Sequence, residues 1–126
     1  MRLLTSLAIA AVLALAATPA SAATANFQGN CTHSGSIVSC TFDGLRPSSN
    51  PSSCPGSFIW KYSWDFNDGS TALTGNNQIT HDYDDSTDYF PKLTVICWDG
   101  NTPNKTRHVC IHFGSPGCIQ VGVGWN

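Results

Sequence analysis

The chain contains no glutamate, so all eight of its acidic residues are aspartates. Without glutamate it lacks the His-Glu-x-x-His motif of zinc proteases and the residue that closes an EF-hand calcium loop. Glycine-rich nucleotide loops and the Gly-x-Ser-x-Gly elbow of serine hydrolases are missing as well. No catalytic constellation remains, and we expect a protein that is not an enzyme and needs no cofactor.

Basic residues are also scarce. The chain has six lysines and arginines, of which five follow residue 22, so residues 23–126 carry a net charge near −3 with neutral histidines. Nucleic acids and anionic membranes attract basic patches, and we expect neither as a partner. Beyond residue 17 no apolar run is long enough to cross a membrane.

The N-terminus has the pattern of a secretory signal. Arg2 precedes an apolar run over residues 7–17, and Ala20-Ser21-Ala22 follows as a small-residue cleavage site. We predict a signal peptide over residues 1–22 and an extracellular or periplasmic protein; the alternative is a buried core helix. Removing 22 of the 126 residues leaves 104, enough for one domain.

An even number of cysteines in a short secreted chain predicts disulfides. All six lie beyond residue 22, at Cys31, Cys40, Cys54, Cys97, Cys110 and Cys118. We therefore expect three disulfide bonds. The competing hypothesis of a zinc site lacks any Cys-x-x-Cys pair.

Alternating apolar residues between turn signals predict strands and no helix. The candidate strands cover residues 25–31, 37–43, 58–66, 70–73, 78–83, 89–97 and 107–113. The strand at 58–66 carries five aromatics at period two, and we expect all of them in the core: Phe58, Trp60, Tyr62, Trp64 and Phe66.

We expect the last two of these strands to pair. Three alternate residues of the first strand would then face inward with three of the second: Leu93, Val95 and Cys97, with Val109, Ile111 and Phe113. Residues 114–126 form a tail whose alternation allows an extra edge strand. The pattern predicts an all-β antiparallel sandwich of about seven strands.

One stretch resembles the motif of the PKD (polycystic kidney disease) domain, Tyr-x-Trp-Asp-Phe-Gly-Asp-Gly. The matching residues are Tyr62, Trp64, Asp65, Phe66, Asp68 and Gly69, followed by the His-x-Tyr pair His81 and Tyr83. Asn67 replaces the usual first glycine, and asparagine tolerates the same left-handed backbone. The resemblance covers residues 25–113 and implies an immunoglobulin-like β-sandwich in which His81 and Tyr83 pack and hydrogen-bond.

This resemblance also bears on the disulfides. Cys31 and Cys40 flank the turn between the first two strands, a placement that occurs in many PKD-like sequences, and we favour their pairing. In an immunoglobulin-like sandwich Cys54 lies at the same pole as Cys97. Cys110 would face outward, where the tail can bring Cys118. Pairing of Cys97 with Cys110, or of Cys40 with Cys97, stays open.

Four aspartates crowd a short segment, at Asp82, Asp84, Asp85 and Asp88. Clustered carboxylates can hold calcium, which some PKD-like domains bind. The alternative is that these aspartates form turns between strands. His108, Cys110 and His112 share one face of their predicted strand and can bind zinc or copper only if Cys110 is not oxidised.

Trp98 and Trp125 have no obvious place in the core. Exposed tryptophans stack on sugars or anchor a protein partner; the alternative is that they cover a loop. Family members usually help engage protein or polysaccharide, so the resemblance implies a module for extracellular binding or adhesion. A calcium-binding structural module and a small secreted effector or inhibitor of a hydrolase are the alternatives.

Overall fold

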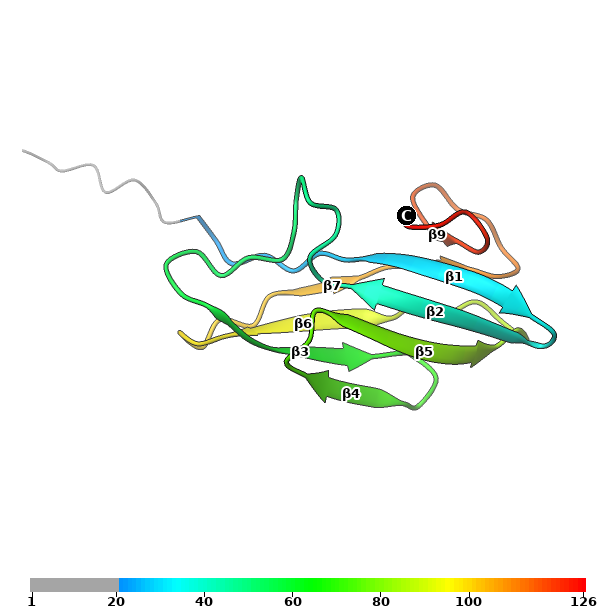
Figure 1. Cartoon of the computed structure of the whole chain (residues 1–126), viewed down its shortest axis with the longest axis horizontal. Coiled ribbons are helices and arrows are strands. Elements are labelled where there is room, and N and C mark those ends of the chain that lie inside the picture. The colour runs from blue at the N-terminus through cyan, green and yellow to red at the C-terminus, as the bar shows by residue number, and fades with distance from the viewer. Residues whose placement is uncertain (1–20) are drawn as a thin grey trace, which may run out of the picture.

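The computed structural model describes residues 21–126. The predicted signal peptide over residues 1–22 therefore lies almost wholly outside the described residues. The described chain forms two stacked antiparallel sheets and a short extra pair of strands (Figure 1). Its strands are β1 (Gln28–Ser34), β2 (Ile37–Asp43), β3 (Ile59–Asp65), β4 (Thr71–Thr74), β5 (Gln78–Asp84), β6 (Lys92–Cys97), β7 (Asn104–Thr106), β8 (Val109–Cys110) and β9 (Ile119–Gln120).

The first sheet has the order β1-β2-β5 and the second the order β4-β3-β6-β7. Strand β2 pairs with both neighbours in full register, which places Cys40 beside Cys31 on one side and His81 on the other. Within residues 21–126 there is no helix. The predicted all-β immunoglobulin-like sandwich is confirmed.

An aromatic cluster fills the space between the sheets. Trp64 of β3 is fully buried, and its ring lies 5.1 Å from that of Phe27 and 5.6 Å from that of Phe42, measured between centroids. Because each strand alternates its side chains between two faces, both sheets contribute inward residues to this cluster. Full burial of such side chains contributes roughly 1.5–3 kcal/mol each, so this cluster is a main stabilising element.

The prediction that all five aromatics of residues 58–66 lie in the core is wrong for two of them. Tyr62, Trp64 and Phe66 are buried, but Phe58 is 76% exposed and Trp60 is 46% exposed. The register between β3 and β6 shifts between Ile59 and Lys61, which is a β-bulge at Trp60. An extra residue reverses the alternation, so Ile59 packs against the core and its two aromatic neighbours turn outward.

The predicted antiparallel pairing of residues 89–97 with 107–113 is present only at its start, between Tyr89 and Val109, and is wrong for β6. A tight turn closes after β6, with the Cys97 amide donating to the Asn101 carbonyl at 2.9 Å. The chain therefore returns at once, and β6 pairs with β7 instead. The Arg107 and Val109 amides donate to the carbonyls of Pro91 (3.1 Å) and Tyr89 (2.8 Å), which continues the antiparallel pairing as far as the buried Val109. Strand β8 also runs parallel to β9, and Phe113 is 72% exposed rather than inward.

Residues 24–26 do not extend β1 as predicted, because they pair with a loop. Thr24 exchanges two 2.9 Å backbone hydrogen bonds with Ser53, and the Asn26 amide donates to Ser52 Oγ at 2.9 Å. The strand accordingly begins at Gln28.

The C-terminal tail lies along the free edge of β1 (Figure 1). Gly29 and Asn126 exchange two 3.0 Å backbone hydrogen bonds, and Val121 forms a bridge with Cys31. The Arg107 guanidinium donates to three carbonyl oxygens, those of Phe27 (3.1 Å), Asn126 (3.0 Å) and Gly117 (2.8 Å). Burial lowers the pKa of this guanidinium. The tail thus covers an edge that would otherwise expose unpaired backbone groups.

The turn after β2 depends on a buried carboxylate. The Asp43 carboxylate accepts hydrogen bonds from Leu45 N, Asn77 Nδ2 and Gln78 Nε2. It also forms an ion pair with Arg46 Nε. Burial acts to raise the pKa of Asp43, but these contacts outweigh it and hold the pKa below its ordinary value. The next residue is Gly44, where a Cβ would lie 2.7 Å from the Tyr62 ring, so only glycine fits without a shift.

We predict that Asp43→Asn lowers the free energy of unfolding at pH 7 by about 1–3 kcal/mol, because an amide presents N–H groups to buried donors. A lowered native pKa stabilises the fold above the unfolded pKa and loses this effect as the pH falls through the native value. The difference in free energy of unfolding between wild type and Asp43→Asn should therefore be largest near pH 7 and become smaller as the pH falls. Urea unfolding between pH 7 and pH 3 measures it; Asp82→Asn, on the exposed face of β5, is the control.

Candidate functional site

Three disulfides cross-link the sandwich, one between the paired strands β1 and β2 and two that involve loops. They join Cys31 to Cys40, Cys54 to Cys97 and Cys110 to Cys118. These are the favoured pairs, and neither Cys97–Cys110 nor Cys40–Cys97 occurs. The Cys54–Cys97 bond joins the loop before β3 to the end of β6, so these two segments are held together at one pole of the molecule.

Three exposed aromatic residues lie at that pole, and we call Phe58, Trp60 and Trp98 the aromatic platform. Phe58 is joined to Trp98 through a backbone hydrogen bond. The rings of Trp60 and Trp98 lie 5.8 Å apart at 53° to each other. Trp98, which follows β6, is 66% exposed. Lys61 Nζ lies 5.7 Å from the Trp60 ring and adds a cation–π contact at its margin.

The backbone beneath the platform is rigid. The amide of Trp98 donates to the carbonyl of Phe58 at 2.9 Å, which extends the β3–β6 ladder past its last regular pair. Cys97 is buried and bonded to Cys54, directly before Trp98. The platform is thus pre-formed, and a ligand would not have to order it on binding.

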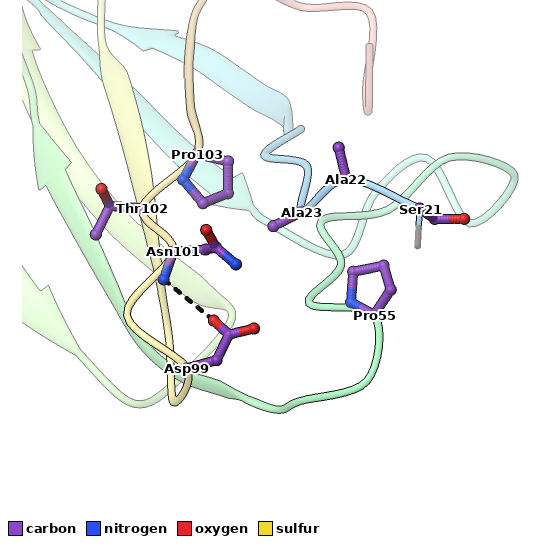
Figure 2. A pocket seen from close by; sticks show the side chains of 8 residues that line it. All are labelled: Ser21, Ala22, Ala23, Pro55, Asp99, Asn101, Thr102 and Pro103. Atoms are coloured by element: carbon purple, nitrogen blue, oxygen red, sulfur yellow. Dashed lines mark hydrogen bonds between the residues drawn. The ribbon is translucent and has the colours of Figure 1, made fainter. Parts of the chain in front are cut away.

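A pocket of about 440 Å³ lies near the platform, between the N-terminal segment and the turn after β6 (Figure 2). Its lining residues are Ser21, Ala22, Ala23, Pro55, Asp99, Asn101, Thr102 and Pro103. Cleavage after Ala22, as the sequence predicts, would remove two of them. We therefore assign no ligand to this pocket.

Trp125 lies elsewhere, in the tail. The Arg46 guanidinium is 4.3 Å from the centre of its ring, so the tryptophan is only partly exposed. Of the two tryptophans that the sequence singles out for binding, the structure places Trp98 in an open aromatic cluster and gives Trp125 a packing contact.

The motif residues around Phe66 make structural contacts. The His81 ring stacks on Phe66 with centroids 3.9 Å apart, and its Nε2 lies 2.6 Å from Asp68 Oδ2. Tyr83 donates its hydroxyl hydrogen to the Phe66 carbonyl at 2.9 Å, and burial raises the pKa of Tyr83.

Asn67 adopts a φ of 64°, the left-handed conformation that its position requires. Asp65 Oδ1 accepts the Asn67 amide at 3.0 Å, and Gly69 in the same turn also has a positive φ.

The four clustered aspartates point to different partners. Asp84 accepts from Ser86 and from the Tyr89 hydroxyl at 2.9 Å, while Asp85 pairs with His33 at 3.2 Å. Asp88 binds a separate loop, and Asp82 is exposed on β5. Among residues 21–126 no three histidine, cysteine or acidic side chains form a group that can hold a metal ion. The structure thus does not bring the predicted calcium ligands together.

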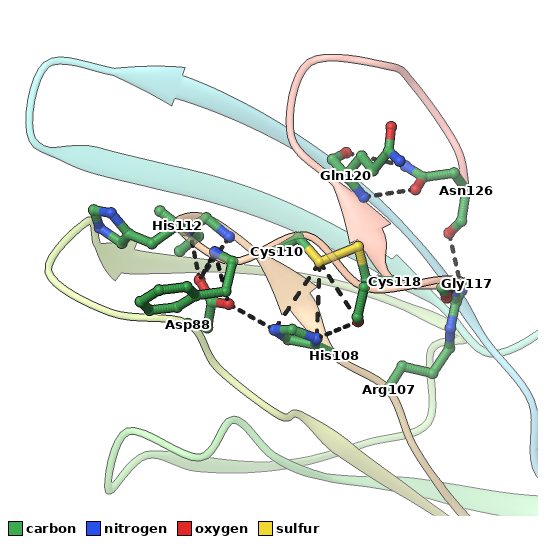
Figure 3. Close-up of a disulfide and its surroundings, with 12 residues drawn as sticks. Asp88, Arg107, His108, Cys110, His112, Gly117, Cys118, Gln120 and Asn126 are labelled. Atoms are coloured by element: carbon green, nitrogen blue, oxygen red, sulfur yellow. Dashed lines mark hydrogen bonds and ion pairs between the residues drawn. A yellow bond between two sulfur atoms is a disulfide. The ribbon is translucent and has the colours of Figure 1, made fainter.

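The predicted zinc or copper ligands, His108, Cys110 and His112, are also bonded to other partners (Figure 3). Cys110 is oxidised to a disulfide with Cys118. His108 Nε2 lies 2.7 Å from Asp88 Oδ2, and His112 Nε2 contacts the Asp85 carbonyl. The two histidines therefore have different partners and do not converge on Cys110.

Sequence reasoning missed Phe58 and Trp60 as surface residues, although one signal was present. The alternate positions Lys61, Ser63 and Asp65 are polar, whereas the next in that series is Ile59. An apolar residue at the wrong parity marks the point where the alternation reverses. It also missed Ser115, which folding brings to His108.

Two stacked antiparallel sheets cross-linked by disulfides, with no helix among residues 21–126, define an immunoglobulin-like module. A model of the PKD domain family matches residues 10–111. The chain therefore belongs to the PKD domain family, whose members are non-catalytic immunoglobulin-like modules often found in extracellular binding or adhesion. No curated protein matches the chain. In the described residues no helix is long and apolar enough to cross a membrane.

We predict that acrylamide quenches the fluorescence of Trp60 and Trp98 readily but leaves Trp64 shielded, because only the first two are exposed. Trp60→Phe and Trp98→Phe should each reduce the initial quenching slope. A triple variant that also carries Trp125→Phe should retain only blue-shifted, poorly quenched emission from Trp64. Quenching of that variant as strong as in wild type would contradict the two-sheet core.

Proposed function

We propose that the protein is a secreted, non-catalytic PKD module that binds an extracellular polysaccharide through its aromatic platform. The observation that supports this most directly is the contact between the exposed rings of Trp60 and Trp98, with the exposed Phe58 hydrogen-bonded to Trp98 through the backbone. Large aromatics on a surface cost solvation free energy when nothing covers them, and clusters of them mark binding sites. Family membership and the three disulfides indicate an extracellular location.

The chemistry of the platform favours a sugar chain over a charged ligand. Two tilted tryptophans 5.8 Å apart offer ring faces to the apolar C–H faces of pyranose rings. The net charge near −3 of residues 23–126 would repel an acidic polymer. A neutral, insoluble polysaccharide is thus the best match, and an extracellular protein such as collagen is the other candidate.

Secretion is part of this proposal. Arg2, the apolar run over residues 7–17 and the Ala-x-Ala site at Ala20 and Ala22 support export and cleavage after Ala22. Export would deliver the cysteines to an oxidising compartment in which all three disulfides form. The adhesive module would then act outside the cell as residues 23–126.

We predict that Trp60→Ala and Trp98→Ala each weaken binding to insoluble neutral polysaccharide by roughly 5- to 30-fold, as expected for central aromatic contacts. The measurement is a depletion isotherm of the mature protein on cellulose, chitin and collagen. Because the two rings touch, the double variant should lose less than the sum of the two single losses in free energy.

The matched control is Phe113→Ala, which removes an equally exposed aromatic from the opposite pole of the sandwich, where the Phe113 amide donates to Asp88 ahead of β6. It should leave the isotherm unchanged. If wild type binds none of these polymers, or if Phe113→Ala weakens binding as much as Trp98→Ala, the platform is not the contact surface.

A further inference from the structure

Three side chains meet at the pole opposite the platform: Asp88, His108 and Ser115. His108 Nε2 lies 2.7 Å from Asp88 Oδ2, and His108 Nδ1 lies 2.8 Å from Ser115 Oγ. Each ring nitrogen thus has one partner, and the three groups form a series from carboxylate through imidazole to hydroxyl (Figure 3 labels Asp88 and His108). This order is that of an activated nucleophile with its base and orienting group.

The carboxylate end of the series is fixed and ionised. The Asp88 side chain is only 7% exposed, and it accepts the amides of Ile111 (2.9 Å), His112 (2.6 Å) and Phe113. Burial acts to raise the pKa of Asp88, but hydrogen bonds from these amides and from His108 outweigh it and lower the pKa. Asp88 therefore stays an acceptor at neutral pH.

The acceptor role of Asp88 determines which nitrogen of the neutral His108 ring carries the proton. Because Asp88 can only accept, Nε2 of His108 must carry the hydrogen, and Nδ1 is left as the acceptor for the Ser115 hydroxyl. The ring is held in this orientation by Phe90, which stacks on it with centroids 4.6 Å apart. His108 is thus a positioned base.

The serine end is exposed but held. Ser115 lies in the turn over residues 114–117, between Cys110 and Cys118, and its carbonyl accepts the Cys118 amide at 3.3 Å. Cys110 Sγ lies 3.7 Å from His108 Nδ1, so the disulfide packs against the imidazole. The bond therefore keeps the serine near its base while leaving the hydroxyl open to solvent.

We propose that Ser115 is a reactive nucleophile that accepts acyl groups from carboxylic esters. Ser115 Oγ attacks the ester carbonyl carbon as its proton moves to His108 Nδ1. The carbonyl carbon–oxygen bond to the alcohol then breaks, the departing oxygen takes the proton from His108, and the acyl group stays on Ser115 as an ester. Asp88 stabilises the transient imidazolium. The pole is open to water and encloses no substrate, so the outcome is covalent modification rather than rapid turnover, and it does not depend on the platform.

The test is acylation of the purified, disulfide-bonded protein by p-nitrophenyl acetate, followed by intact mass and peptide mapping. Ser115 should react about 100-fold faster than other surface serines, the usual contribution of a positioned base. Ser115→Ala should abolish the fast adduct, and His108→Gln, which retains polar contacts, should slow it to the background rate.

Ser86 is the internal control, because its hydroxyl contacts the Asp84 carboxylate without an imidazole. It should react at the background rate, and Ser86→Ala should change nothing. Acylation of Ser115 no faster than that of Ser86, or a fast rate that persists in His108→Gln, would overturn the proposal. Ser115→Ala should bind polysaccharide as wild type does in the depletion isotherm. The acylation test and the polysaccharide-binding test can therefore fail separately.

Discussion

The packing of Trp64 between the two sheets is the interaction on which the rest of the structure depends. Its ring contacts Phe27 and Phe42, which come from the first sheet and the segment that leads into it. The indole Nε1 is buried without an acceptor among the described residues, a cost of about 1–3 kcal/mol. The chain tolerates this because the aromatic contacts and the apolar area that Trp64 buries outweigh one unpaired donor.

From this core the sandwich displays two chemically different poles. At one pole the bulge in β3 turns Trp60 outward, and the ladder with β6 sets Trp98 beside it. At the other pole the loops after β5 and β8 are held by Asp88 and His108. Because the sheets are rigid and the loops are stapled by disulfides, each pole keeps its geometry without a ligand.

Aspartate serves this protein mainly as a backbone acceptor. Asp65, Asp68, Asp84 and Asp99 each accept the amide two residues further along, and each of these contacts closes a turn. Asp43 does the same for Leu45, and Asp88 accepts backbone amides of a distant loop, those of Ile111 and His112. This accounts for an acidic composition that gathers no calcium site in the described chain, since the carboxylates are bound to different backbone segments.

The sequence by itself determined the all-β sandwich, the family and the inward residues of the central strand beyond the bulge, because these follow from side-chain periodicity and local turn chemistry. Only the tertiary structure decided where that periodicity fails. The bulge at Trp60 exists because β3 must match the register of β6, where Ile59 pairs with Cys97 and Lys61 with Ile96, and alternation within one strand does not specify it. In the same way, Ser115 meets His108 only because the Cys110–Cys118 bond and the parallel pair β8–β9 fold the tail back. Tertiary pairing decides such contacts, and side-chain periodicity within one strand does not encode them.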